Sequence, residues 1–444
     1  MRKGFVLGVV LLVVQIPLLA LILIQSDVFG GLSHDNARRV AFALDGGVYV
    51  AGTTVSGDGD TNAFLRKYDA SRVLEWERAY GLPFDSTNGF DDDFIEGLTV
   101  GADGSAYMAG MLGTGVLFLA KFDAAGNLVW DSTYGDNATI ASGAAAGPDA
   151  HIYVSAHFSG TDTSDPTHLE SRLLKFDSNG NLVWARAWGG IGEPGVPGLD
   201  QSHGVATSAD GVYMAGETNN FFANDAYLVK FDFDGNLLWQ RDWGVDGVQA
   251  PFTGLTVAFG VTTDAAGNAY FTGNTSDSGH LKNIVLVKFS GTGELIWSKV
   301  GGPGFGTGRD VAVSPDGTAV FVSGNILADD PDFFGGFGFV AEFTAAGKAK
   351  KANSWGSSPE FSASAESVVV NGDGLVVTAG FVGPGPHEFG RASNSAKDAD
   401  THLIVPTGVV QNLPNLLEAQ DGQILPFDST SLGGDDAFTL WMQR

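Results

Sequence analysis

Residues 121–130 read KFDAAGNLVW, and nearly the same letters return at residues 175–184 as KFDSNGNLVW and at residues 230–239 as KFDFDGNLLW. Weaker copies of this segment end at Trp76 and Trp297. The tryptophans that close the five copies are spaced by 54, 54, 55 and 58 residues, and they are Trp76, Trp130, Trp184, Trp239 and Trp297. Such regular spacing indicates a structural repeat of about 55 residues.

Each repeat predicts four short strands. The first is small and β-branched, as at 40–44, and an Asp- and Gly-rich turn leads into the second, as at 45–52 (DGGVYVAG). The third strand ends in the Lys-Phe pair, and an Asp-x-x-Gly-Asn turn then forms a hairpin into the fourth. In the fourth strand, LVWARAW at 182–188, large and small side chains alternate with a period of two. The tryptophans are therefore expected to pack one repeat against the next rather than to bind a ligand.

Four strands in each of seven repeats predict an all-β fold, namely a seven-bladed β-propeller of four-stranded blades that covers residues 26–444. The blades are expected to begin near Val40, Phe94, Ala144, Val205, Gly260, Val311 and Ser367. A loop insertion at about 382–433 interrupts the seventh blade, which has no fourth strand of its own at the end of the sequence. Either residues 26–31, which resemble the end of a fourth strand, close the ring, or the seventh blade has three strands.

Residues 1–25 predict one N-terminal transmembrane helix, acting as a membrane anchor or signal helix. The run from Phe5 to Ile24 is apolar at all but two positions, and about 20 residues span a bilayer core. The absence of a small-x-small cleavage site favours an uncleaved anchor over a secretory signal. Arg2 and Lys3 are expected to keep the N-terminus in the cytoplasm. This predicts a plasma-membrane protein with the propeller outside, and secretion is the alternative.

Composition excludes several functions. The net charge of −27 disfavours a nucleic-acid partner, whose phosphates need Lys and Arg. The sequence has no cysteine, so disulfides, thiolate metal sites and cysteine nucleophiles are excluded. It also lacks the His-Glu-x-x-His, Gly-x-Ser-x-Gly and P-loop motifs. No catalytic or cofactor-binding residues are therefore predicted.

Calcium is the one metal that the sequence suggests. Asp58, Asp60 and Asn62 space their oxygen atoms as the ligands of a calcium loop do, but Ala63 stands where such a loop needs glycine. The alternative is that these residues, like those of the repeated Asp-x-x-Gly-Asn segment, only form turns.

The repeated elements together resemble SBBP-type propeller repeats of microbial surface and secreted proteins. The resemblance rests on the Asp-x-x-Gly-x-x-Tyr-Val-Ala-Gly element, the Ala-Phe-Leu-x-Lys strand and the Gly-Asn-Leu-x-Trp turn, and it extends from about residue 40 to 444. It implies display at the cell surface or outside the cell and a non-enzymatic binding or adhesion role. The expected ligand is an extracellular protein or glycan.

Two other functions stay open. The Gly-Asn-Leu-x-Trp turn also resembles the segment by which quinoprotein propellers dock their blades, so an extracytoplasmic enzyme, quinoprotein-like or glycan-active, is one alternative. Lys3-Gly4-Phe5 before an apolar helix resembles the leader of pilin-like proteins, which would make the chain a filament subunit with a propeller head. Val9 departs from that family's pattern, because an acidic residue is expected there.

Overall fold

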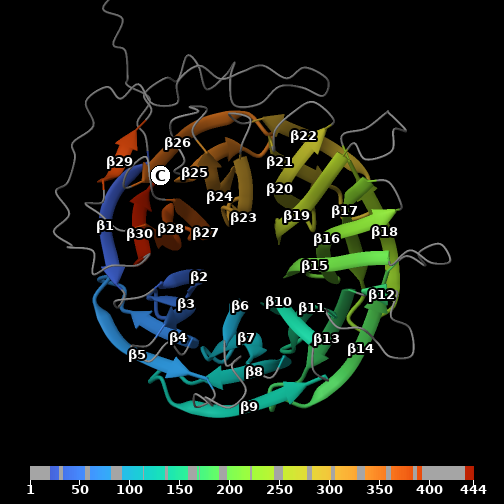
Figure 1. Cartoon of the computed structure of the whole chain (residues 1–444), viewed down its shortest axis with the longest axis horizontal. Helices are drawn as coiled ribbons and strands as arrows, with labels where there is room; N and C mark the ends of the chain where they lie inside the picture. Colours follow the sequence, from blue (N-terminus) through green and yellow to red (C-terminus); the bar gives the residue numbers. More distant parts are fainter. Residues whose placement is uncertain are drawn as a thin grey trace, which may run out of the picture.

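The structure is a computed structural model, and Figure 1 shows a closed ring of β-sheets around a central axis. It describes residues 21–29, 34–55, 61–81, 93–113, 115–135, 139–158, 168–169, 171–189, 198–220, 223–244, 254–277, 283–301, 306–327, 336–356, 362–383, 388–392 and 436–444. In these ranges no helix has both the length and the apolar character that crossing a membrane requires. Most of the predicted N-terminal helix, residues 1–20, falls outside them.

The strands form seven blades, and in each the first strand lies nearest the axis (Figure 1). A single parallel bridge between β17 and β19 joins blades 4 and 5 into one larger sheet. Blade 1 contains β2 (Asn36–Phe42), β3 (Val48–Val55), β4 (Thr61–Tyr68) and β5 (Leu74–Tyr80). Blade 2 contains β6 (Phe94–Val100), β7 (Ala106–Leu112), β8 (Val116–Phe122) and β9 (Leu128–Tyr134). Blade 3 contains β10 (Thr139–Ala146), β11 (Ile152–Phe158), β13 (Ser171–Phe176) and β14 (Leu182–Trp188). Blade 4 contains β15 (Gly198–Thr207), β16 (Val212–Asn220), β17 (Ala223–Phe231) and β18 (Leu237–Trp243).

The remaining blades follow the same order. Blade 5 contains β19 (Gly254–Thr263), β20 (Ala269–Asp277), β21 (Asn283–Phe289) and β22 (Leu295–Gly301). Blade 6 contains β23 (Gly306–Val313), β24 (Ala319–Leu327), β25 (Gly336–Thr344) and β26 (Ala349–Gly356). Blade 7 contains β27 (Ala363–Val370), β28 (Leu375–Val382), β30 (Asp436–Gln443) and β1 (Ile22–Phe29). The predicted seven-bladed, four-stranded propeller is confirmed, and each predicted blade start falls within the first strand of its blade.

The N-terminal strand closes the ring. β1 pairs antiparallel with β30 from Ile22, opposite Gln443, to Phe29, opposite Ala437. The seventh blade is therefore four-stranded, as the interpretation that residues 26–31 complete it predicted. Strand β1 also begins earlier than expected, because Ile22 to Gln25 are extended and paired with β30 although they lie in the range predicted to be helical.

Two short strands lie outside the four-stranded pattern. β12 (His168–Leu169) pairs in parallel with β15, at the inner edge of blade 4. β29 (Glu388–Ala392) belongs to the predicted insertion of blade 7, yet it pairs antiparallel with β26 and gives blade 6 a fifth, outermost strand. Part of the insertion thus returns to the neighbouring blade.

The repeated Trp and Lys side chains join each blade to the next. Trp76 Nε1 in blade 1 donates a hydrogen bond to the carbonyl of Ala124, in the outer hairpin turn of blade 2, at 3.1 Å. Lys67 Nζ reaches the same carbonyl at 3.5 Å and donates to Asp45 in its own blade at 2.6 Å. The other four repeated tryptophans donate across the next junction to the carbonyls of Ser178, Phe233, Gly291 and Ala345. Backbone acceptors thus hold these indole groups at the blade junctions.

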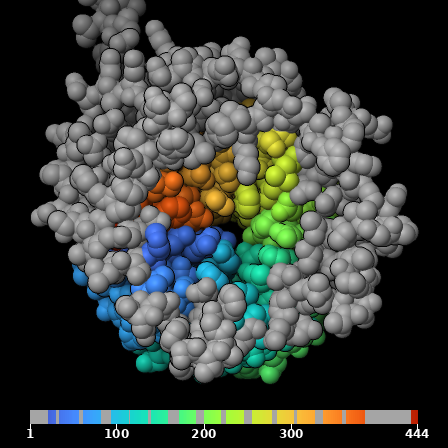
Figure 2. All heavy atoms as spheres, in the orientation of Figure 1, coloured from blue at the N-terminus to red at the C-terminus, as the bar shows by residue number. Residues whose placement is uncertain are grey.

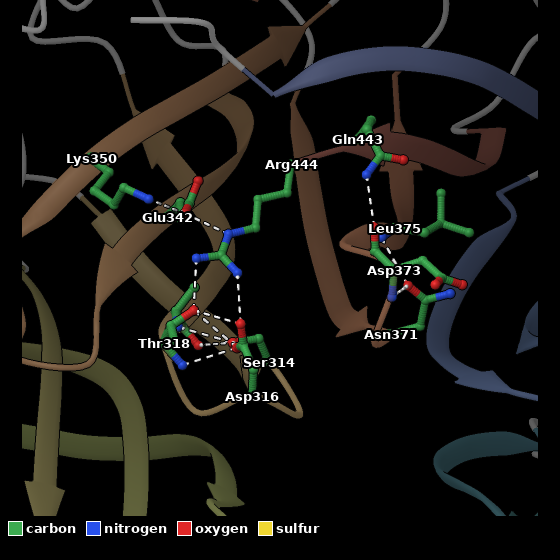
Figure 3. A network of polar contacts seen from close by, with 11 residues as sticks. Ser314, Asp316, Thr318, Glu342, Lys350, Asn371, Asp373, Leu375, Gln443 and Arg444 are labelled. Atoms are coloured by element: carbon green, nitrogen blue, oxygen red, sulfur yellow. Dashed lines mark hydrogen bonds and ion pairs between the residues drawn. The ribbon is translucent and has the colours of Figure 1, made fainter.

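Blade 6 departs from this pattern because blade 7 has no outer hairpin turn. Strands β30 and β1 are neighbours in blade 7 but come from opposite ends of the sequence. Glu342 occupies the lysine position of the repeat, and Arg444 donates to its Oε1 at 3.1 Å. Arg444 also reaches Thr318 and Asp316, while Lys350 Nζ donates to Glu342 at 2.8 Å (Figure 3). Glu342 and Asp316 of blade 6 thus both pair with Arg444, so the basic group that a lysine supplies within the other blades comes here from blade 7.

Candidate functional site

Every blade carries a β-bulge in its first strand, next to the channel. In blade 1 Ala37 faces Gly52 and Arg39 faces Ala51, so Arg38 is an extra residue with no opposite partner. The same shift occurs once in each of the other six first strands. We call the seven extra residues the bulge ring, and they are Arg38, Glu96, Ser142, His203, Phe259, Arg309 and Glu366.

The bulges have a local cause in the sequence. At a bulge the backbone of the first strand bends toward its partner strand. Gly52 lies opposite the bulge of blade 1. A Cβ atom added there would lie 1.9 Å from the carbonyl oxygen of Asn36, which is too close for any side chain in this backbone conformation. Glycine stands at the corresponding position in six blades, namely at Gly52, Gly110, Gly216, Gly273, Gly324 and Gly380. The final glycine of the repeated Tyr-Val-Ala-Gly element thus accommodates the bulge in six blades, whereas blade 3 forms the same bulge opposite Ala156.

All seven side chains of the bulge ring line a cavity of about 200 Å³ in the channel. Figure 2 shows the hollow at the centre of the ring. The cavity is also lined by Arg39 and by His157, which lies near the end of β11. Because β11 runs away from the tight turn at 147–151, the cavity lies nearer the face opposite the tight turns.

One half of the bulge ring is charged. Arg309, Glu366, Arg38 and Glu96 follow one another around blades 6, 7, 1 and 2 with alternating sign. Arg38 Nη1 lies 3.4 Å from Glu96 and 3.9 Å from Glu366, and Arg309 Nε lies 3.7 Å from Glu366. The nearby Glu96 carboxylate raises the pKa of Arg38, outweighing the opposite effect of burial. All four side chains can thus face one ligand.

The other half of the bulge ring is mainly aromatic. The rings of His203 and Phe259 lie 5.1 Å apart, and His157 lies 6.3 Å from His203. Burial, followed by the nearby His203, lowers the pKa of His157 to about 4, so its imidazole is neutral at pH 7. Ser142 turns toward a buried partner, with its Oγ 2.9 Å from that of Ser202. This half offers flat, largely uncharged surface.

The predicted calcium ligands are not brought together by anything the structure describes. Asp58 and Asp60 fall outside the described residues, and Asn62 lies in β4, paired with Thr54 of β3. The similar segment at Asp232 is a hairpin turn, in which the Asp232 carboxylate accepts hydrogen bonds from the amide and side chain of Asn236. Across the described ranges, no three His, Asp or Glu side chains are placed to hold a metal ion.

No family model matches this chain, and no curated protein matches it. The resemblance to SBBP-type repeats therefore remains a resemblance. Among solved structures, a chain of one titled "Crystal Structure of Mitotic Checkpoint Complex" is similar with a TM-score of 0.44 and 9% sequence identity, over 85% of this chain and 96% of that chain. The seven-bladed assignment rests on the strand pairing described above.

Proposed function

We propose that this protein is a non-enzymatic binding module, displayed outside the cytoplasm, which holds its ligand at the channel face. A propeller is consistent with an interaction role, and the bulge ring is the observation that supports this one most. A bulge re-aims a side chain at the expense of regular pairing. Closing the ring does not by itself require a bulge in all seven first strands. It also does not require that the seven bulge residues line one cavity.

We also propose that the chain is held at a membrane by the apolar segment that precedes β1. Because Leu21 is already packed against blade 6, the apolar run from Phe5 to Ala20 remains, and its length is just below the ~17 residues that are the lower limit for a transmembrane helix. Any shortened version for binding studies should start no later than Leu21. Its carbonyl accepts a hydrogen bond from Asn353 Nδ2 at 2.8 Å, which ties it to blade 6.

The expected partner at this face is an extracellular protein or glycan. The full chain should be screened against surface proteins and glycans beside a double variant, Arg38→Met with Glu366→Gln, which removes one charge of each sign. The matched control is Glu294→Gln with Lys348→Met, a pair of opposite charges in exposed tight turns. Capture of a partner should be lost in the first variant, by tenfold or more, and kept in the second.

The insertion of blade 7 is the competing site, and a deletion separates the two. Replacing residues 393–435 by a short flexible linker leaves β29 on blade 6. Capture that survives this deletion but is lost in the channel variant supports the proposal. Capture that is lost in the deletion but kept in the channel variant contradicts the proposal.

A further inference from the structure

The cavity differs in chemistry from one side to the other, and the two sides meet at one residue. The Arg309 guanidinium lies 5.2 Å from the centre of the Phe259 ring, within cation–π distance, and 3.7 Å from Glu366. It therefore stands where the charged half of the bulge ring borders the aromatic half. A molecule in contact with both halves has its charged group beside Arg309.

The charge of the cavity wall favours an anion. The wall contains three guanidinium groups, Arg38, Arg39 and Arg309, and two carboxylates, Glu96 and Glu366. Two further carboxylates stand behind the wall: Glu217 Oε1 lies 3.4 Å from His203 Nε2, and Asp310 accepts hydrogen bonds from Ser367 and from the amide of Val368. Burial raises the pKa of Asp310. Among the side chains that line the cavity, the arginines outnumber the carboxylates by one, in a chain whose net charge is −27.

The arginines still have hydrogen-bond donors to offer. The ion pairs of Arg38 and Arg309 with Glu366, at 3.9 and 3.7 Å, are longer than hydrogen bonds. The Nε atoms of Arg38 and Arg309 are buried and have no hydrogen-bond partner in the protein. A buried N–H group without a partner is costly, so a ligand that becomes its acceptor once the arginine side chain turns toward the cavity gains this energy on binding. A carboxylate is suited to this because it accepts two parallel bonds from one guanidinium.

The volume limits the size of the ligand. A cavity of about 200 Å³ is smaller than the ~300–1,000 Å³ of pockets for drug-sized molecules. It has room to enclose a single ring with one short substituent, whereas an oligosaccharide or a peptide could only lie across its mouth. The flat surfaces of Phe259 and His203 suit a planar ring.

We propose that the channel cavity binds a small planar aromatic carboxylate, with its ring against Phe259 and His203 and its carboxylate on Arg309 and Arg38. This ligand is additional to the protein or glycan partner at the channel face, and it rests on the same proposed role of the channel as a binding site. Its recognition combines one negative charge with one aromatic ring.

Titration calorimetry of the full chain with four probes tests this ligand class. Benzoate carries both features, acetate only the charge, benzyl alcohol only the ring, and benzamidine the ring with the opposite charge. Benzoate should bind at least tenfold more tightly than any of the other three. Arg309→Met should weaken benzoate by tenfold or more, Arg309→Lys by less, and Phe259→Leu should reduce the advantage of benzoate over acetate.

The outcomes separate this inference from the proposed function. The control variant Glu294→Gln with Lys348→Met should bind benzoate as the unchanged chain does. Absence of benzoate binding, or preference for benzamidine, overturns the inference even if partner capture still depends on Arg38 and Glu366. Conversely, benzoate binding that depends on Arg309 and Phe259 supports the inference even if the channel variant Arg38→Met with Glu366→Gln still captures the partner.

Discussion

At the scale of single residues, His157 makes the stability of the ring depend on pH. Its pKa is lowered to about 4 in the folded protein by burial and then by His203, whereas an unfolded chain has the usual value of about 6.5. Between these two values the unfolded chain binds a proton that the folded chain does not. The free energy of unfolding should therefore fall as pH drops through this window, by about 3 kcal/mol in total from this group.

His157→Gln should remove this part of the pH dependence. Urea unfolding at neutral pH and near pH 4 measures it as the difference between the two proteins, which cancels the other groups that titrate in the same range. We expect the variant to lose less stability on acidification than the unchanged chain. Parallel pH curves for the two proteins would show that His157 is protonated in the folded state.

Repeated residues could be predicted from the sequence, while the residues of the candidate site could not. The tryptophans and lysines recur because each junction from blade 1 to blade 6 presents a backbone carbonyl of the same outer turn to them. The bulge ring cannot be found from repeated residue types, because its members share a backbone position and not a side-chain type. The available signal was indirect, namely the glycine within the second strand, as at Gly52, which lies opposite the bulge.

At the scale of elements, β1 closes the ring by pairing with β30, and a truncation can remove only its first half. A chain without residues 1–20 keeps β1, whereas a chain without residues 1–25 loses Ile22 to Gln25. The second truncation also removes the mutual hydrogen bonds of Gln25 and Arg72, at 3.0 and 3.1 Å, which join β1 to blade 1. We expect its melting temperature to be lower by several degrees than that of the first.

Exposure of part of β30 should also make the shorter chain associate, because an unpaired strand edge is a template for another strand. Melting followed by circular dichroism and size-exclusion chromatography at two concentrations measure both effects. A synthetic peptide of residues 21–29 should raise the melting temperature of the shorter chain, whereas a scrambled peptide should not. Equal melting temperatures for the two truncations would mean that the first half of β1 contributes nothing to closure.

Elements formed within one repeat could be predicted better than those formed between distant segments. The four strands of each blade follow from local alternation and turn residues. By contrast, the pairing of β29 with β26 brings part of the blade 7 insertion onto blade 6, and no periodicity in the sequence marks that partner. The start of β1 at Ile22 could not be predicted, because Ile22 to Ile24 continue an apolar run that is typical of a membrane helix.

At the scale of the whole molecule, the start of β1 determines how an anchored ring would face the membrane. Ile22 pairs with Gln443, whose Nε2 donates to the carbonyl of Asp373 in the tight turn of blade 7 at 3.0 Å. Leu21 therefore leaves the ring on the face of the tight turns, while the cavity lies nearer the other face. A membrane segment directly before Leu21 should turn the tight turns toward the bilayer and the cavity away from it.

Because the sequence has no cysteine, single labelling sites can test this orientation in the full chain embedded in lipid nanodiscs. Ser71 is exposed in the outer tight turn of blade 1, and His34 is exposed before the first strand of the same blade, on the opposite face. A fluorophore on Ser71→Cys should be quenched by nitroxide-labelled lipids more strongly than one on His34→Cys. Stronger quenching at His34→Cys would place the cavity against the membrane and exclude capture of extracellular partners at that face.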